Sequence, residues 1–318
     1  MRRSTAPHNH GTNSIHERSG SVLPIMQNAK RNGIGQDATL ADRWKTGFDP
    51  LIVRCLSVNH TRRRGKMHSM KILVTAGNTQ APIDRVRCIT NIFTGRTGTG
   101  IALHALGRGH AVTLLTSHPE ILADFPDAPA AECTGWTVCP YRTFDDLAAQ
   151  MASQLGKGGW NVVIHCAAVS DYQSGGIFGL APGTRFDPAS GAWSGAEEGP
   201  RLVDRAAGKV KSDEPELWLR LVRAPKLVDR IRTDWGFTGI LVKFKLEVGK
   251  SDEQLLDIAE KSRRQSHADW MVANTLEGAA AWAYLGPFAD GYRKVTRPEL
   301  PGRVLDAVES SKHEVGHG

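Results

Sequence analysis

The sequence lacks the cysteine and histidine spacing of a structural metal site. Five cysteines occur in 318 residues without a CxxC pair, and His165 beside Cys166 has no spaced partner that would complete a site. An odd number of cysteines without such spacing argues against a zinc site and a disulfide framework, and it favours a reducing, cytoplasmic location. We expect free thiols at Cys55, Cys88, Cys133, Cys139 and Cys166.

Long apolar runs are also missing, so neither a membrane span nor a signal-peptide core is expected. Residues 1–69 hold 12 Lys or Arg and 4 Asp or Glu, a net charge of +8, which leaves −1 for the rest of the chain. A nucleic-acid partner would require its basic surface on the folded domain, where geometry can be fixed. We therefore expect neither a nucleic-acid nor a membrane partner.

Residues 1–69 are interpreted as a disordered basic leader, because they show little hydrophobic periodicity and contain a basic cluster at residues 62–64. Four acidic residues weaken a transit-peptide interpretation. An alternative is that translation starts at Met70, directly before the first apolar strand, so that the leader is not part of the native protein. Residues 70–318 are then expected to form a single domain.

Beyond Met70, apolar runs alternate with amphipathic segments of helix length. This alternation predicts an α/β domain with a Rossmann-like, doubly wound, mainly parallel sheet. The predicted strands are 71–75, 111–115, 161–167, 216–222, 239–246 and 269–275, and the predicted helices are 98–106, 144–155, 225–232 and 252–264.

Three shorter features complete the predicted organisation. Residues 171–209 have seven glycines before Pro200 and no sustained period, so they predict a long loop that can include a short hairpin. Pro225 suits a first helical position, and Ser251 with Gln254 suggests a capping box. Residues 281–304 carry short aromatic runs followed by an exposed helix.

Two glycine-bearing loops near the first strand are candidates for nucleotide binding. Gly77 follows the strand directly, whereas Gly95 and Gly98 open the next helix beside Arg96. Small residues let a phosphate approach the helix N-terminus, and Arg96 adds a mobile positive charge. Glycine also occurs in ordinary turns, so the first loop alone supports ligand binding and a structural turn equally. The second loop favours an anion site over a structural turn.

Polar and small residues at neighbouring positions extend this candidate site. Asn91 lies between the two loops, and its amide can hold a carboxylate and then a tetrahedral adduct, although a lone asparagine usually forms a turn. Ala167 and Ala168 follow a buried strand and leave room for a flat ring or a ribose. Asp171 can accept from sugar hydroxyls or face a cation; the alternative is a strand-end turn capped by Asp.

Lys209 and Lys211 lie two residues apart before a predicted strand. If this segment is extended, both ammonium groups point to one face, which suits a triphosphate. A solvated strand edge is the alternative. Phe244 and Asn274 lie near the ends of the following strands, at what should be the same edge of the sheet.

Taken together, these segments resemble the phosphopantothenate-cysteine ligase family of coenzyme A biosynthesis. The matching segments, in order, are VTAGNTQAPID, RVRCITN, TGRTG, AAVSDY, KVKS, FKLE and VAN. Any one of them is weak, but seven in register over about 200 residues are fairly specific. The resemblance implies that the substrate carboxylate attacks the α-phosphate of a nucleoside triphosphate, pyrophosphate leaves, and the amine of cysteine then displaces the nucleotide.

The resemblance also assigns roles to individual residues. Asn91 would hold the reacting carboxylate and the acyl intermediate, and Lys209 would neutralise the attacked α-phosphate. Arg87 would lie near the phosphate of the substrate, with Asn274 also on the substrate side. Together with the residues above, the predicted nucleotide site comprises Gly77, Gly95, Arg96, Gly98, Ala167, Ala168, Asp171, Lys211 and Phe244.

The family further implies CTP or ATP as co-substrate, Mg2+ with the triphosphate, and a cytoplasmic homodimer; the residues that would hold the metal stay unassigned. Many bacterial members have SSGKMG where this chain has FTGRTG at residues 93–98, and the AVSD and FKLE forms resemble the ATP-using eukaryotic branch more closely. The nucleotide is therefore left open. Because no flavoprotein decarboxylase half precedes Met70, we expect a stand-alone form.

Two other function classes remain as alternatives. A short-chain dehydrogenase that binds NAD(P) is suggested by TGRTGTG, but this turn does not directly follow the first strand. No YxxxK motif starts at any of the four tyrosines, Tyr141, Tyr172, Tyr284 and Tyr292. A nucleotide-binding protein without catalysis is the second alternative, and the presence of Asn91 and Lys209 argues against it.

Overall fold

The computed structural model describes residues 69–195 and 199–315. The leader predicted for residues 1–69 lies outside the described residues, apart from its last residue. All described residues belong to one compact unit of the chain.

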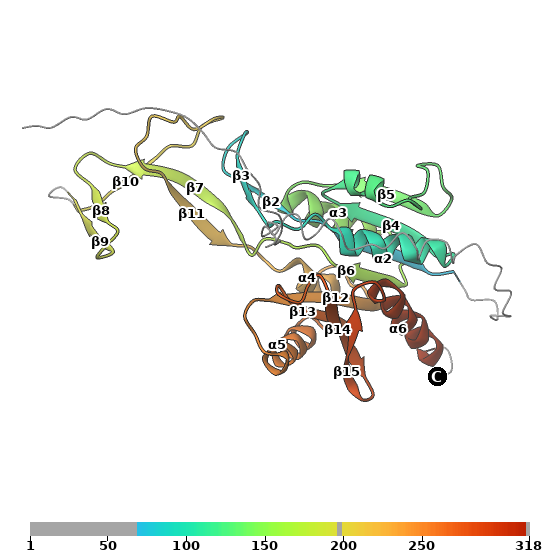
Figure 1. The fold of residues 1–318 in the computed structure, drawn as a ribbon. Helices are drawn as coiled ribbons and strands as arrows, with labels where there is room; N and C mark the ends of the chain where they lie inside the picture. Colours follow the sequence, from blue (N-terminus) through green and yellow to red (C-terminus); the bar gives the residue numbers. More distant parts are fainter. Residues whose placement is uncertain (1–68, 196–198, 316–318) are drawn as a thin grey trace, which may run out of the picture. The chain divides into compact units, whose positions relative to one another are not determined.

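An eight-stranded sheet forms the centre of this unit (Figure 1), with the strand order β15-β14-β13-β12-β6-β1-β4-β5. The six strands from β13 to β5 are parallel, and the β14–β15 hairpin adds two antiparallel strands at one edge. Their bounds are β1 Lys71–Ala76, β4 Ala111–Thr116, β5 Trp136–Pro140, β6 Val162–His165, β12 Ile240–Glu247, β13 Trp270–Thr275, β14 Trp282–Phe288 and β15 Gly291–Thr296.

The strand order reverses between β1 and β6, because β4 and β5 lie on one side of β1 whereas β6, β12 and β13 lie on the other. In doubly wound sheets, ligands bind beyond the carboxyl ends of the strands at such a reversal. The predicted Rossmann-like, mainly parallel α/β fold is thus confirmed, and the reversal marks the edge where a site is expected.

Helices cover both faces of the sheet because side chains along each strand alternate between two apolar cores. Ile72 and Val74 pack with α2 (Arg96–Gly107) and α6 (Leu300–Val315) on one face. Leu73 packs on the other face with α3 (Phe144–Gly156) and α4 (Leu227–Thr233). Helix α5 (Asp252–Gln265) packs against β13 on that second face. Each buried aliphatic side chain contributes about 1.5–3 kcal/mol to folding.

The helix signals in the sequence were partly correct. Ser251 and Gln254 form the predicted capping box of α5. Pro225 does not occupy the first position of α4, because Lys226 is the N-cap and the helix begins at Leu227. The C-terminal helix was predicted to be exposed, but α6 buries one side in the core through Val304 and other apolar residues.

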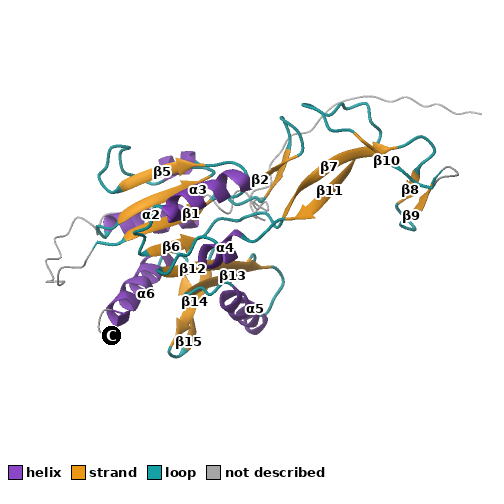
Figure 2. Cartoon of the chain, turned by 180° about the vertical axis from the view of Figure 1, so that it is seen from behind, coloured by secondary structure: helices purple, strands orange, loops and turns teal. Residues whose placement is uncertain are grey.

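The prediction of a long loop over residues 171–209 was wrong, although the short hairpin that it allowed is present as β8 and β9. This segment contains β7 (Tyr172–Leu180), β8 (Arg185–Asp187), β9 (Ala192–Ser194) and β10 (Leu202–Asp204). Strand β7 pairs antiparallel with β10 and with β11 (Trp218–Arg223), so these three strands form a sheet of their own (Figure 2). We call residues 172–223 the arm. The predicted strand 216–222 exists, but it belongs to the arm and not to the central sheet.

The glycines of β7 explain why this strand was not predicted from the alternation of apolar and polar residues. A Cβ on Gly175 would lie 2.7 Å from the Val222 side chain on the neighbouring strand. Glycine within a strand often marks such a close approach. The arm also has its own aromatic cluster, in which the ring centroids of Phe186, Trp193 and Trp218 lie 4.7–5.0 Å apart.

Several elements were not predicted, among them β5, β14 and β15 of the central sheet. Strands β2 (Gln80–Pro82) and β3 (Cys88–Thr90) form a hairpin between β1 and α2, and the 3-10 helix η2 spans Pro119–Asp124. Three-residue strands carry too few positions to show alternation. Among the described residues, no helix combines the length and the apolar character needed to cross a membrane.

Candidate nucleotide and substrate site

The two glycine loops meet at the carboxyl end of β1. Gly77 follows β1 and Gly95 is the N-cap of α2, and both have φ of +90°. A Cβ on Gly95 would lie 2.4 Å from the backbone nitrogen of Gly77, and one on Gly98 would lie 2.8 Å from the Ala76 Cβ. Helix α2 can begin this close to β1 only because these positions lack side chains. The split glycines therefore form one turn, into which the β2–β3 hairpin is inserted.

We expect Gly95→Ala to destabilise the protein more than Gly109→Ala, a matched control. Gly109 has φ of +86°, but a Cβ added there would have no atom within 4 Å, so this substitution carries only the backbone cost of about 1–2 kcal/mol. The substitution at Gly95 adds a steric clash of about 1–3 kcal/mol. Urea unfolding of both variants measures the difference; equal losses would contradict the close approach of the two loops.

The N-terminus of α2 is suited to an anion. Its N-cap makes no side-chain hydrogen bond, and its first turn contains no acidic residue. Free N–H groups and the helix dipole there favour negative charge. Burial raises the pKa of the Cys166 thiol to about 12, so this group adds no negative charge near pH 7.

Two arginines flank this helix end. Arg96, predicted to be a mobile charge, instead forms an ion pair with Asp124 of η2 and lies over the Phe125 ring, 5.7 Å from its centroid. Arg297 donates to the Thr97 hydroxyl from the connection between β15 and α6. Burial lowers the pKa of Arg297 from its usual value. Nothing in the sequence signalled Arg297, because it lies 200 residues from Thr97.

Asn91 and the two alanines come together as predicted. The Asn91 Nδ2 donates to the Ala168 carbonyl at 2.9 Å, and the Ala168 N–H donates to the Gly77 carbonyl at 2.7 Å. Asn91 is half-buried, and its Oδ1 and second amide hydrogen have no partner among the described residues. That unpaired half of the amide is available to a ligand.

A buried polar pair supports the turn after β6. The Ala167 N–H donates to the Thr75 hydroxyl at 3.2 Å, and His165 Nδ1 lies 3.0 Å from the same oxygen. Burial, and secondarily the charge of Lys243, lowers the pKa of His165 to about 4. The imidazole is therefore neutral near pH 7, and it stabilises the backbone that carries Ala167.

Strand register places Phe244 and Asn274 at the same edge. Lys243 pairs with His165, so Phe244 is level with Cys166 just beyond β6. Phe244 is half-buried on the α2 face, and alternation along β13 puts the buried Asn274 on that face too. Asp171 is exposed at the base of the arm; only its backbone carbonyl makes a hydrogen bond there, accepting from the Ala224 N–H.

The lysine segment contains a bend at Lys209 and is not part of a strand, so the condition for both lysines to share a strand face is not met; both lysines are exposed beside the buried Val210. The Val210 N–H donates to Asp84 at 3.1 Å, and the Arg87 guanidinium donates to the Val210 carbonyl at 2.9 Å. These bonds clamp the lysine segment to the β2–β3 hairpin.

Asp84 is the centre of this clamp and was not singled out in the sequence. Its carboxylate accepts from the Arg87 side chain and from the backbone of Val86, Arg87 and Val210. The bond from the Arg87 guanidinium, followed by those backbone bonds, holds the pKa of Asp84 well below its usual range. A cavity of about 540 Å³ opens beside the clamp, lined by Arg87, Lys209 and Lys211 among others.

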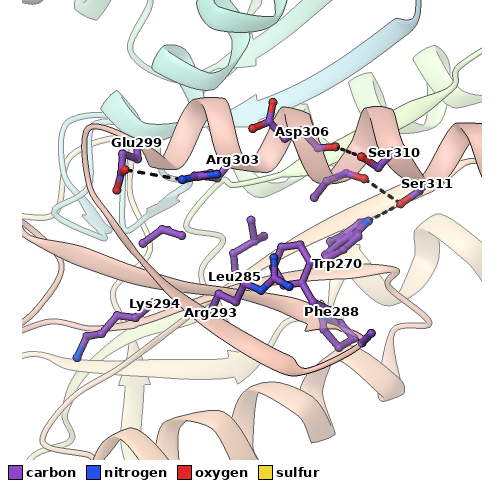
Figure 3. Close-up of a pocket in the computed structure, with 14 residues that line it drawn as sticks. Trp270, Leu285, Phe288, Arg293, Lys294, Glu299, Arg303, Asp306, Ser310 and Ser311 are labelled. Carbon is purple, nitrogen blue, oxygen red and sulfur yellow. Dashed lines mark hydrogen bonds and ion pairs between the residues drawn. The ribbon is translucent and has the colours of Figure 1, made fainter.

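A larger cavity of about 910 Å³ lies between the β14–β15 hairpin and α6 (Figure 3). Trp270 forms part of its wall and donates to Ser311 of α6 at 3.0 Å, while the Arg293 guanidinium lies over the Phe288 ring at 4.2 Å. None of the predicted site residues lines this cavity. It is thus separate from the candidate site.

Comparison with known proteins agrees with the motifs. Residues 67–177 match the family model described as the DNA/pantothenate metabolism flavoprotein C-terminal domain, and this range contains the glycine turn, Asn91 and the Ala167–Ala168 turn. This match agrees with the resemblance of the motifs to phosphopantothenate-cysteine ligases.

Named relatives are similar to most of this chain. The coenzyme A biosynthesis bifunctional protein CoaBC of Thermococcus kodakarensis is 29% identical over 267 residues, which is 82% of this chain and 56% of that protein. CoaBC of Escherichia coli K12 is 31% identical over 227 residues, covering 71% of this chain and 46% of the relative. The chain thus spans about half the length of these curated relatives.

A solved structure supports the same placement. The crystal structure of the DNA/pantothenate metabolism flavoprotein from Streptococcus pneumoniae has a TM-score of 0.59 and 27% sequence identity. It covers 76% of this chain, and all of that chain is matched. The resemblance to the ligase family therefore extends from short motifs to the fold.

Proposed function

We propose that this protein is a ligase that joins 4'-phosphopantothenate to cysteine through an acyl-nucleotide intermediate, in coenzyme A biosynthesis. The observation that carries the proposal is the meeting of the glycine turn with Asn91 and Ala168 at the sheet reversal, in a chain that resembles ligases of this kind. The curated relatives are bifunctional proteins about twice as long as the matched region, so the activity is our inference for this chain.

In the first step, a carboxylate oxygen of phosphopantothenate attacks the α-phosphorus of the nucleoside triphosphate. The bond from that phosphorus to the bridging oxygen breaks, and pyrophosphate leaves with the bond electrons. We assign the phosphates to the N-terminus of α2, and Lys209 to the charge that develops at the α-phosphate. Arg87 and Lys211 lie beside the same cavity as Lys209 and suit the phosphate groups of the substrates.

In the second step, the unprotonated amine of cysteine attacks the acyl carbon. The tetrahedral adduct collapses, the nucleoside monophosphate leaves with the former carboxylate oxygen, and the amine loses one proton to solvent. Asn91 is assigned to the reacting oxygen atoms, because one amide hydrogen is fixed on Ala168 while the other and Oδ1 are unpaired. The remaining roles proposed are nucleotide contacts for Ala167, Asp171 and Phe244, and a substrate contact for Asn274.

The co-substrate is proposed to be CTP or ATP, accompanied by Mg2+. Magnesium in such sites is held largely by phosphate oxygens and water. Within residues 69–195 and 199–315, no group of three or more His, Cys, Asp or Glu is arranged to hold a metal ion without the substrate. We therefore attribute no step to a protein-bound metal.

We also propose a cytoplasmic homodimer. The arm carries large exposed apolar side chains, including Tyr172, Leu202 and Leu221, and exposed apolar surface can mark a protein interface. The described cysteines are unpaired, as is usual in a reducing compartment.

The proposal is tested by incubating the protein with 4'-phosphopantothenate, Mg2+ and either CTP or ATP, with and without cysteine. We expect pyrophosphate to appear only when phosphopantothenate is present, and the amide product only when cysteine is added. Silence with both nucleotides would overturn the ligase assignment. Oxidation of NAD(P)H in a parallel assay would favour the dehydrogenase alternative instead.

A further inference from the structure

Asn78 is a buried polar residue to which no role has been assigned above. It follows Gly77 directly and is only 5% exposed. Its Nδ2 donates to the Asn91 carbonyl at 2.7 Å, and its Oδ1 accepts from the Ser117 hydroxyl at 3.3 Å. The Asn78 backbone N–H donates to the same hydroxyl at 2.9 Å. Both ends of the Asn78 amide are therefore used within the protein.

The geometry around Gly77 is what allows Ser117 to hold Asn78. A Cβ on Gly77 would lie 2.2 Å from the Ser117 hydroxyl oxygen, so only glycine leaves room for it. The Tyr141 phenol donates to the Ala76 carbonyl at 2.7 Å, at the end of the same strand. The orientation of the Asn78 amide is thus fixed by a network anchored on the end of β1.

Asn91 directly follows β3, whose Thr90 pairs with Gln80 and has its hydroxyl 3.4 Å from the Asn91 carbonyl, but the side chains on either side of Asn91 are exposed. The segment from Arg87 to Thr90 is exposed, and Ile92 is 81% exposed.

The Asn78 bond holds the Asn91 backbone, and the Ala168 carbonyl holds one amide hydrogen of its side chain. Asn78 also forms an isolated parallel β-bridge with Ala168. Each of the residues Asn78, Asn91 and Ala168 is therefore linked to the other two.

We propose that Asn78 is a positioning residue that fixes the backbone of Asn91, so that the unpaired half of the Asn91 amide faces the reacting carboxylate and acyl group. The inference rests on the ligase function proposed above. Asn78 acts through Asn91 and touches no substrate. Displacing a reacting group by about 1 Å can lower a rate about 100-fold, so loss of this restraint should be visible in turnover.

The test begins with Asn78→Ala and a matched control, Asn161→Ala. Asn161 also supplies a side-chain bond to the backbone of the β1 segment, accepting from the Lys71 N–H at 2.8 Å, but at the opposite end of the strand. We expect Asn78→Ala to lower kcat about 10- to 100-fold with the KM for nucleotide within about twofold. Asn161→Ala should leave both unchanged, and thermal unfolding of each variant shows that it is folded.

A double-mutant cycle separates positioning from general destabilisation. In the Asn91→Ala background no amide remains to be positioned, so adding Asn78→Ala should lower kcat no further. If the double variant loses kcat by the product of the two single losses, the proposal is overturned. The proposal is also overturned if the kcat of Asn78→Ala lies within about threefold of wild type. Product formation by the wild-type protein is measured first. If the wild type forms no product, the proposed function is wrong, and the variants are not compared.

Discussion

Replacing Lys209 by Gln is expected to lower the rate of pyrophosphate release about 100- to 1,000-fold. Lys209 is exposed beside the clamp formed by Asp84, Arg87 and Val210, so the substitution removes a charge without removing a packed side chain. A cation aimed at a developing negative charge typically contributes a factor of this size. The measurement is pyrophosphate release under saturating nucleotide and phosphopantothenate, compared with the unfolding temperature of the same sample.

Lys157→Gln is the control for the loss of one positive charge. Lys157 is exposed at the C-terminal end of α3, and it is not among the residues assigned to the site. Its variant should turn over at the wild-type rate. Near-normal turnover of Lys209→Gln would show that this lysine does not neutralise the α-phosphate, and the cavity beside Arg87 would then need another role.

The second large effect is expected for Asn91→Asp, with a loss of about 100-fold or more in product formation. The change replaces the donor to Ala168 by a carboxylate oxygen, so that two acceptors face each other at 2.9 Å. It also places a negative charge beside the substrate carboxylate. The variant therefore loses the hydrogen bond that orients the side chain, and its added charge opposes the negative charge of the reacting oxygen atoms.

Release of pyrophosphate with and without cysteine separates the two steps for this variant. A fall in both conditions places Asn91 in formation of the intermediate, and a fall only in amide formation places it in the use of the intermediate. Asn161→Asp is the control, because Asn161 accepts from the Lys71 N–H and a carboxylate can do the same. If Asn91→Asp matches that control, Asn91 is a turn residue and not part of the chemistry.

Five parallel strands of the central sheet could be predicted because their signal is local, whereas β5, β14 and β15 were not predicted. Buried parallel strands such as β1 and β6 are continuous apolar runs, and α3 and α5 carry apolar stripes and capping boxes within their own segments. Each of these features can be recognised within a few neighbouring residues. The alternation of these runs predicted a doubly wound sheet, but the reversal of strand order between β1 and β6 is known only from the structure.

The arm could not be predicted from such patterns. Strand β7 owes its stability to pairing with β10 and β11, and its glycines erase the alternation that would reveal it. The strand propensity of a residue reflects its packing against neighbouring strands more than an intrinsic preference of its backbone. A strand whose neighbours are unknown is therefore easily mistaken for a loop.

The candidate site shows the same division. Gly95, Gly98 and Asn91 stand out in the sequence because their types suit phosphate and carboxylate chemistry. Asp84 and Arg297 do not, because their meaning lies in partners that are distant along the chain, Val210 and Thr97 respectively. The ion pair that occupies Arg96 also depends on η2, an element with no clear sequence signal.

The most direct test of the account follows oxygen from the substrate carboxylate. Phosphopantothenate labelled with 18O in its carboxylate is incubated with the protein, cysteine and the preferred nucleotide. The 18O content of each product is then determined by mass spectrometry. Attack on the α-phosphorus predicts one labelled oxygen in the nucleoside monophosphate and none in pyrophosphate. Label in inorganic phosphate, or an amide formed without labelled monophosphate, would contradict the acyl-nucleotide mechanism assigned to this site.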